Sequence, residues 1–154
     1  MEIREAKKED LQAIKDLRYD LAIFEKNLGH DIVEPEWTYT EVGYKDLKYF
    51  FNEQFIYVAE EDGKIVGFIT GEIFKKKAWY TVQLGSINNL YVIEEYRHNG
   101  IGKKLMQTMI NALKEKGITN IELNTFSGNV DAIKFYEKLG FKKANLQMLY
   151  QKNI

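Results

Sequence analysis

The stretch Arg97-His98-Asn99-Gly100-Ile101-Gly102-Lys103-Lys104 decides the fold, because it joins an apolar strand to an amphipathic helix. Helix N-termini carry a partial positive charge and favour Asp or Glu, yet this helix start is surrounded by basic residues. Its two glycines remove side chains that would keep a ligand away from the backbone amides. The stretch therefore predicts an anion site at a helix N-terminus.

The elements on either side of this loop are predicted by their apolar patterns. Apolar residues recur at helical spacing from Ile101 onward until Gly117, which is typical of a C-terminal cap. The preceding residues from Ile87 to Val92 are rich in β-formers. The loop thus lies at the carboxyl end of a strand, where open α/β sheets bind their ligands.

Two better-known phosphate motifs fit this loop poorly. A Walker-type loop needs four residues between its first glycine and Gly-Lys-Ser/Thr, whereas one residue separates Gly100 from Gly102. The dinucleotide fingerprint needs a third glycine where Leu105 stands, although Glu122 lies about where its ribose-binding acid is expected. The fingerprint and a plain solvated basic turn remain the alternatives.

A second helix is predicted in Asn129-Val130-Asp131-Ala132-Ile133-Lys134-Phe135-Tyr136-Glu137-Lys138-Leu139-Gly140-Phe141. Asn129 suits an N-cap, and Gly140 followed by Phe141 suits a Schellman ending. Between the two helices, residues 118–125 alternate apolar and polar side chains as a strand does. The order is strand, helix, strand, helix, strand.

Residues from about 88 to 141 resemble the acetyl-CoA-binding core of the GNAT superfamily of N-acetyltransferases. The pyrophosphate motif of that superfamily, Gln/Arg-x-x-Gly-x-Gly/Ala, is matched by Arg97, Gly100 and Gly102. Its second signature, an Asn, then Ala, then Phe-Tyr, then Gly-Phe, is matched in order by Asn129, Ala132, Phe135, Tyr136, Gly140 and Phe141.

The resemblance implies an α/β (α+β) fold, the GNAT fold, with a mixed twisted sheet of six to seven strands and about four helices. The implied order is β-α-α-β-β-β-α-β-α-β(-β), in a single domain over residues 1–154. Its fourth and fifth strands would splay apart, with the pantetheine arm of coenzyme A in the gap. The implied cofactor-binding residues are Leu90, Tyr91, Val92, Arg97, His98, Asn99, Gly100, Ile101, Gly102, Lys103 and Asn129.

The implied activity is transfer of an acetyl group from acetyl-CoA to a primary amine by direct attack in a ternary complex. The resemblance assigns Tyr136 as the proton donor to the coenzyme A thiolate. Many relatives place a Glu base on the fourth strand, where this chain has Ser86, Asn88 and Asn89. Glu72, Glu122 or a water held by Asn88 or Asn89 stay open as the general base. The alternative activity is a non-catalytic acyl-CoA-binding sensor.

The first half of the chain is predicted from periodicity to hold two helices, over residues 11–24 and around 47–51, and a hairpin. The hairpin turns at Asp62-Gly63, between strands at 55–60 and 65–74. A further strand is expected to begin near Trp79. The acidic and aromatic segment from Glu25 to Glu41 either holds a cationic acceptor or folds over the sheet as an ordinary loop.

Composition agrees with one core and narrows the partners. The chain has 154 residues, 45% hydrophobic residues and a net charge of −1, so it lacks the basic footprint of a nucleic-acid-binding domain. The run Lys75-Lys76-Lys77 beside Trp79 and Tyr80 is a small exception and indicates a solvated hairpin tip.

Other features set the remaining expectations. The chain has no cysteine, which excludes disulfides and an acyl-cysteine intermediate, and no carboxylate spacing suits a metal, so we expect none. No apolar run resembles a signal peptide or a membrane span, so we expect a cytoplasmic protein without a membrane partner. The acceptor's identity and the oligomeric state, with a homodimer as one option, stay open.

Overall fold

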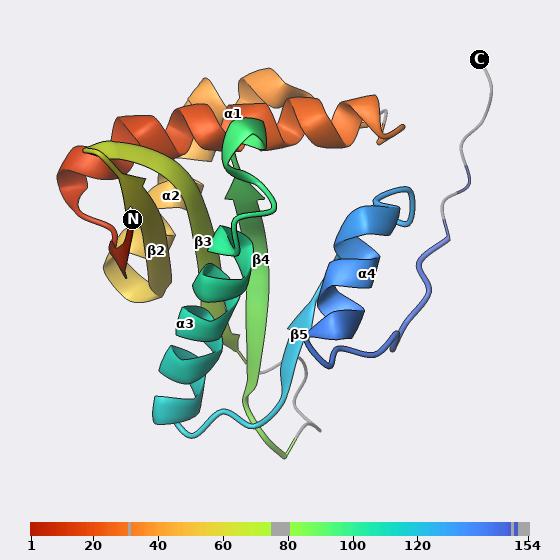
Figure 1. The fold of residues 1–154 in the computed structure, drawn as a ribbon. Coiled ribbons are helices and arrows are strands. Elements are labelled where there is room, and N and C mark those ends of the chain that lie inside the picture. The colour runs from red at the N-terminus through yellow and green to blue at the C-terminus, as the bar shows by residue number, and fades with distance from the viewer. Residues whose placement is uncertain (31, 75–80, 149, 151–154) are drawn as a thin grey trace. The chain divides into compact units, whose positions relative to one another are not determined.

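A mixed five-stranded sheet in the order β1-β2-β3-β4-β5 organises the first part of the computed structural model (Figure 1). The strands are β1 (Glu2–Glu5), β2 (Phe55–Glu61), β3 (Lys64–Phe74), β4 (Leu84–Val92) and β5 (Ile121–Leu123). Strands β1 to β4 pair antiparallel with their neighbours, and β5 pairs parallel with β4. The structure describes residues 1–30, 32–74, 81–148 and 150.

The chain divides into two compact units, Met1–Asn124 and Thr125–Ile154, and each is described by itself. The first unit contains the sheet with α1 (Leu11–Asn27), α2 (Glu41–Glu53) and α3 (Ile101–Glu115). Three short 3-10 helices, η1 (Lys8–Asp10), η2 (Pro35–Tyr39) and η3 (Glu94–Tyr96), lie in its connections. The second unit contains α4 (Val130–Lys138).

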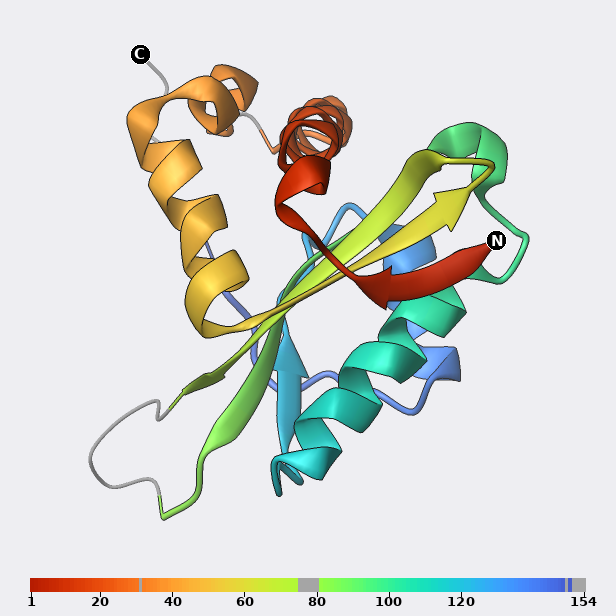
Figure 2. The same cartoon turned by 90° about the vertical axis from the view of Figure 1, so that its left-hand side faces the viewer.

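Helices cover both faces of the sheet in the first unit (Figure 2). On one face, α1 and α2 enclose a core with β2 and β3 whose buried members are Ile14, Leu17, Leu47, Phe50, Ile56, Val58 and Phe68. On the other face lies α3, with Leu105, Met106, Met109 and Leu113 fully buried. The approach of α3 is so close that a Cβ on Gly71 of β3 would lie 2.6 Å from the Met109 Sδ. Glycine at this position therefore leaves room for the Met109 side chain between α3 and β3.

Several sequence predictions of local structure are confirmed. The helices expected at 11–24 and 47–51 are α1 and α2, and the hairpin turns at Asp62-Gly63, where both residues have positive φ. Helix α3 ends as predicted at Gly117, whose N–H donates to the Lys114 carbonyl at 2.8 Å. Caps and tight turns depend on residues close in sequence, which is why the pattern alone identifies them.

The cap predictions for α4 are confirmed inside the second unit. The Asn129 side chain accepts a hydrogen bond from the Ala132 N–H at 3.2 Å, as an N-cap does. At the other end, Gly140 donates to the Glu137 carbonyl and Phe141 to the Tyr136 carbonyl, which is the complete Schellman pattern. The Tyr136 and Phe141 rings lie 6.1 Å apart across this ending.

The strand count differs from the prediction of six to seven. Five strands are present in the described residues, and residues 142–148, where the next strand was expected, have no regular structure. A strand needs a hydrogen-bonded neighbour, and the described part of the second unit offers only a helix. The strand expected from Trp79 begins instead at Leu84; Trp79 itself lies outside the described residues.

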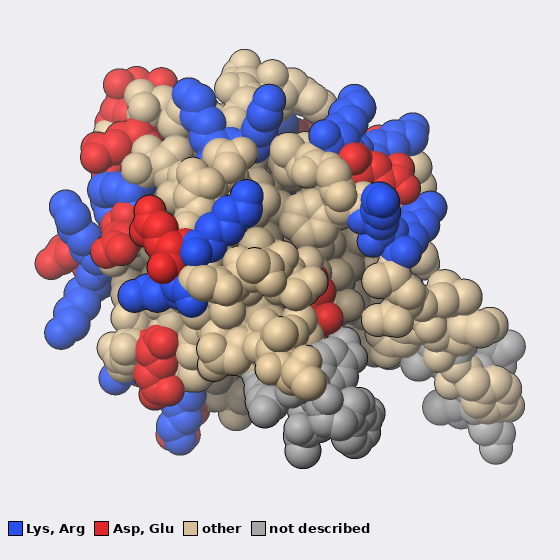
Figure 3. Space-filling model, turned by 90° about the horizontal axis from the view of Figure 1, so that it is seen from below, with Lys and Arg blue, Asp and Glu red and all other residues tan. Residues whose placement is uncertain are grey.

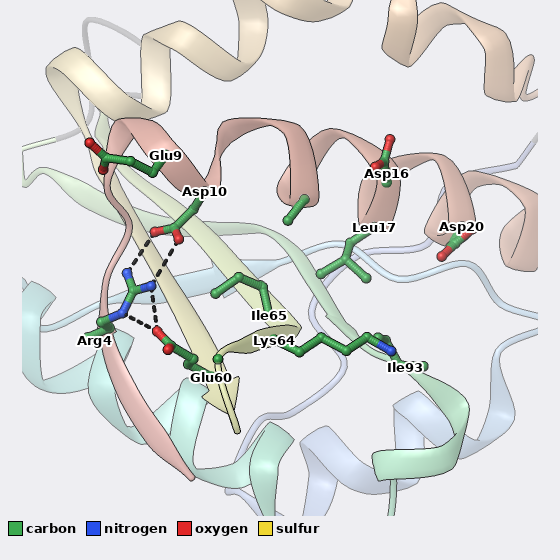
Figure 4. A pocket seen from close by; sticks show the side chains of 12 residues that line it. Arg4, Glu9, Asp10, Asp16, Leu17, Asp20, Glu60, Lys64, Ile65 and Ile93 are labelled. Atoms are coloured by element: carbon green, nitrogen blue, oxygen red, sulfur yellow. Dashed lines mark hydrogen bonds and ion pairs between the residues drawn. The ribbon is translucent and has the colours of Figure 1, made fainter.

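A pocket of about 650 Å³ lies between the start of α1 and the ends of β1 to β3, and ion pairs organise one side of it (Figure 4). The Arg4 guanidinium donates to both oxygens of Asp10, at 2.7 and 2.9 Å, and to Glu60 at 2.8 Å. Asp10 is 8% exposed and also accepts the Lys7 N–H at 2.7 Å. The hydrogen bonds from Arg4 hold the pKa of Asp10 below its ordinary value. None of the predicted site residues lines this pocket.

We expect Asp10→Asn to lower the free energy of unfolding by about 2 kcal/mol at pH 7, because it removes charge-assisted hydrogen bonds from Arg4. The lowered folded-state pKa makes this contribution complete above the ordinary Asp value of about 3.9 and progressively lost below it. Urea unfolding of both proteins at several pH values measures it. The exposed neighbour Glu9, as Glu9→Gln, is the matched control. A difference that persists unchanged at pH 2 would contradict the assignment.

Candidate functional site

Strand β4 pairs with β3 along its whole length, but it pairs with β5 along only its first part. It pairs with β3 from Leu84 to Val92, but with β5 only from Gly85 to Ile87. Beyond Ile87, no described strand pairs with β4 on the β5 side, and the two strands separate (Figure 1). The splayed pair that the resemblance implies is therefore present.

Only some residues of β4 direct their backbone N–H and carbonyl groups toward its unpaired edge. Ile93 donates its N–H toward β3, to the Val66 carbonyl at 2.9 Å. Because backbone groups alternate between the two sides of a strand, the peptide groups of Leu90 and Val92 face the other side, where β5 is missing. Tyr91 faces β3, so of the three residues predicted at this edge, Leu90 and Val92 present their backbone to it.

The N-terminus of α3 has no cap from a side chain. Gly100 is the N-cap residue, with a left-handed φ of 78°, and the first turn contains no acidic residue. The first N–H to bond inside the helix is that of Lys104, which donates to the Gly100 carbonyl at 3.0 Å. The N–H groups of Ile101, Gly102 and Lys103 thus precede the helical ladder and suit an anion.

Arg97 contacts the end of β4. Its Nε donates to the Val92 carbonyl at 2.8 Å, and its guanidinium lies 5.3 Å from the centre of the Tyr91 ring and 5.0 Å from that of Phe24 in α1. This arrangement ties the loop to the strand edge. Because the Val92 carbonyl already accepts from Arg97, the backbone groups left without a partner strand at this edge are the N–H and carbonyl of Leu90 and the N–H of Val92.

The remaining loop residues, His98, Asn99, Gly100 and Lys103, are exposed at the start of α3. His98 has a left-handed φ of 64°, an unusual conformation for a residue with a side chain. With Arg97 and the α3 amides, these residues form one continuous segment at the carboxyl end of β4. The structure therefore brings the predicted residues Leu90 to Lys103 together.

A polar group lies where β4 leaves β5, on the face of the sheet covered by α1 and α2. The pairing of β3 with β4 skips Asn88, which forms a bulge, and the Asn88 amide donates to Glu72 Oε1 at 2.8 Å. The Tyr49 hydroxyl of α2 donates to Glu72 Oε2 at 3.1 Å. Burial and this contact raise the pKa of Tyr49. Beside them the buried Thr70 hydroxyl donates to Asn89 at 3.1 Å.

Tyr49 is a residue that the sequence did not single out. It sits in a run of aromatic residues, Tyr49, Phe50 and Phe51, whose spacing indicates only a core-facing helix. Phe50 is indeed buried, and the Tyr49 ring packs against it with centroids 5.3 Å apart. The Tyr49 hydroxyl was the only feature of this run that could have indicated a polar role.

The acidic and aromatic segment before α2 is largely engaged within the chain. Arg18 of α1 stacks on Trp37 with its guanidinium 4.8 Å from the ring centre, and it pairs with Asp46. Tyr39 donates its hydroxyl to Asp16 of α1 at 2.9 Å. The Trp37 ring was a candidate to bind a cationic acceptor, but the Arg18 guanidinium stacks on it instead. Asp31 lies outside the described residues.

Tyr136 and Asn129 lie in the second unit. Asn129 uses its side chain to cap α4, as described above. The Tyr136 ring contacts Phe135, with centroids 5.4 Å apart, in addition to Phe141. Both residues belong to the helix that the second signature predicted.

Few features favour other classes of site. The face of the molecule in Figure 3 carries acidic and basic side chains interspersed. The lysine run 75–77, with Trp79 and Tyr80, lies outside the described residues. Within the described ranges, no group of three or more His, Cys, Asp or Glu residues could hold a metal ion, and none of the helices found there is long and apolar enough to cross a membrane.

Comparison with known proteins agrees with this arrangement. The family model described as "Acetyltransferase (GNAT) family" matches residues 21–141. An N-alpha-acetyltransferase of Sulfurisphaera tokodaii is 35% identical over 114 residues, which cover 66% of this chain and 68% of that protein. N-alpha-acetyltransferase 30 of Schizosaccharomyces pombe is 33% identical, covering 72% of this chain and 70% of that protein.

A solved structure, aminoglycoside N-acetyltransferase AAC(6')-Iy in complex with CoA, has the same fold with a TM-score of 0.74 at 19% identity. The match covers 99% of this chain and 100% of that one. The half-paired strand, the uncapped helix start and the family match over most of the sequence lead to one identification. The chain belongs to the GNAT family of acetyltransferases and is an acetyl-CoA-dependent N-acetyltransferase.

Proposed function

We propose that the pyrophosphate of acetyl-CoA binds the N-terminus of α3 and that the pantetheine arm lies along the open edge of β4. The observation that carries this proposal is the loss of the β5 neighbour beyond Ile87. An exposed strand edge offers backbone donors and acceptors to any extended chain with amides. The pantetheine arm is such a chain, and the Leu90 peptide groups would pair with it.

The anion site follows from the same stretch. Uncapped N–H groups of Ile101, Gly102 and Lys103 carry the positive end of the helix dipole, and Lys103, His98 and Arg97 add positive charge nearby. Gly102 in the first turn lets phosphate oxygens reach the amides. Asn99 and Gly100 shape the loop before them.

The proposed reaction is direct transfer to a primary amine in a ternary complex. The sequence has no cysteine to carry an acyl intermediate. The amine nitrogen attacks the thioester carbonyl, and the leaving sulfur needs a proton, for which Tyr136 is the proposed donor. The two relatives named above are by name N-alpha-acetyltransferases, so a peptide with a free α-amino group is the first acceptor to test.

The proposal also includes the domain organisation, the cellular location and the partners of the protein. The family match extends across both compact units, which supports a single functional domain over residues 1–154. A cytoplasmic location and the absence of nucleic-acid, membrane and metal partners remain predictions from composition and motif. A homodimer is left to a measurement of mass in solution.

We expect Gly102→Glu to abolish acetyl-CoA binding, because it places a carboxylate among the amides that would hold the pyrophosphate. Calorimetric titration with acetyl-CoA measures the affinity, and circular dichroism checks the fold. The control is Gln107→Glu, which puts the same group on an exposed position further along α3. Undiminished affinity in a folded Gly102→Glu protein would refute the assignment of this loop. Binding of NAD by the wild type, lost in Gly102→Glu, would favour the dinucleotide alternative.

Initial rates measured against both substrates should give intersecting double-reciprocal plots, as attack within a ternary complex requires. Release of free thiol from acetyl-CoA, followed with a panel of peptides, polyamines and aminoglycosides, supplies the rates. Parallel plots together with a stable acetyl adduct on the isolated protein would demand a covalent intermediate. Tight acetyl-CoA binding without turnover on any amine would favour the sensor alternative.

We expect Tyr136→Phe to lower kcat by about 10²–10⁴ with little change in acetyl-CoA affinity, because the hydroxyl is the proposed donor to the departing sulfur. The ring contacts with Phe135 and Phe141 remain, so stability should barely change. The loss should shrink for acyl donors with a more acidic thiol. A wild-type rate in the variant, with chemistry rate-limiting, would make Tyr136 a packing residue.

A further inference from the structure

The cluster of Glu72, Asn88 and Tyr49 lies at the point of the sheet where the proposed cofactor path ends. If the pyrophosphate is bound at α3, at the carboxyl end of β4, the arm must run back along the strand from Val92 toward Asn88. That length of strand spans about 13 Å at 3.3 Å per residue. The thioester end is then directed toward the bulge at Asn88, whose amide holds Glu72.

Glu72 is a carboxylate fixed at both oxygens and still accessible. Asn88 donates to one oxygen at 2.8 Å and Tyr49 to the other at 3.1 Å. Each carboxylate oxygen can accept about two hydrogen bonds, so each retains capacity for a further donor. The residue is half-buried and Asn88 is exposed, so solvent and a substrate reach the group.

The strand register gives the positions of Glu72 and of Glu122, the other candidate base. Ser86 of β4 pairs with Glu72 on one side and with Glu122 of β5 on the other, so all three side chains share the face covered by α1 and α2. Asn88 forms the bulge directly after Ile87, the last residue of β4 that pairs with β5, and its amide donates to Glu72. This contact places the Glu72 carboxylate at the end of the proposed cofactor path, and the variants below compare it with Glu122.

We infer that Glu72 is the group that receives the ammonium of the acceptor and takes up its proton, with Tyr49 and Asn88 as positioning residues. This inference rests on the proposed function. The Glu72 carboxylate accepts a proton from the ammonium, which frees the lone pair of the nitrogen. The nitrogen forms the amide bond to the acetyl carbon as the carbon–sulfur bond breaks. Of the two protons that the nitrogen loses, one ends on the sulfur and Glu72 passes the other to water.

The charge balance around the cluster favours a cationic acceptor. Among the titratable groups of the packed elements, Tyr49 of α2 contacts Glu72, Glu53 of α2 acts electrostatically on Tyr49, and Glu122 of β5 shares the face of the sheet with Glu72. Helix α1 contributes apolar Ile14 and Leu17 to this core and the buried Arg18, which pairs with Asp46 of α2. Strand β4 presents Ser86, Asn88 and Asn89 near Glu72, and Tyr91 further along the same face. No Lys or Arg of the described residues is paired with Glu72 in a salt bridge, so the substrate's ammonium is the cation that completes it.

The variant Glu72→Gln tests this through the pH dependence of kcat/KM. In the wild type the proton passes within the complex, so the rate should stay level from about pH 6.5 up to the pKa of the amine. In the variant only the neutral amine reacts, so kcat/KM should fall about a hundredfold or more at pH 7 for an alkylamine and then rise tenfold per pH unit. The rise should end near pH 8 for a peptide α-amine and near 10 for an alkylamine.

Matched variants separate the explanations. Glu115→Gln, an exposed change on α3 at the opposite face, should leave rate and profile unaltered. Tyr49→Phe keeps its ring packing and should cost several-fold in kcat while keeping the level profile. Unchanged acetyl-CoA affinity by calorimetry and wild-type turnover test the proposed function separately. A wild-type rate in Glu72→Gln, a loss independent of pH, or the pH-dependent loss in Glu122→Gln instead would overturn the role of Glu72.

Discussion

The unequal pairing of β4 is the constraint on which the rest of the site depends. On one side β3 satisfies the strand from Leu84 to Val92, while on the other β5 pairs only as far as Ile87. A strand edge without a neighbour normally invites aggregation. In this chain the same open edge is where we propose that the amide groups of the cofactor pair, with the acetyl group near the point where the β5 pairing ends.

The position of α3 sets the proposed pyrophosphate site at one end of this edge. The Met109 side chain lies close to Gly71 of β3 and the Leu113 side chain lies close to Gly85 of β4, so a side chain at either glycine would displace them. These contacts fix the axis of α3 against the sheet, and Arg97 ties the loop before it to the Val92 carbonyl. The uncapped start of α3 is thereby held at the carboxyl end of β4 by packing on a rigid scaffold.

Charged side chains on the α1 and α2 side have two different uses. Arg18 and Arg4 are engaged by partners of the chain, since Arg18 stacks on Trp37 and pairs with Asp46, and Arg4 bridges Asp10 and Glu60. Arg18 therefore joins α1 to η2 and α2, and Arg4 joins the residues before α1 to strands β1 and β2. Glu72 differs, because its hydrogen-bond partners among the described residues are the neutral donors Asn88 and Tyr49, and no described Lys or Arg forms a salt bridge with it.

The amino-acid sequence by itself determined the local features of this protein. The positions of the helices, the caps at Asn129, Gly117 and Gly140 and the Asp62-Gly63 turn all rest on hydrogen bonds between residues a few positions apart. The family motifs add the order of elements and the cofactor. Tertiary structure decided which side chains meet: Tyr49, Glu72 and Asn88 converge only because the strand register and the bulge align them. The number of strands and the covering of Trp37 by Arg18 also depended on partners distant in sequence, which no local pattern specifies.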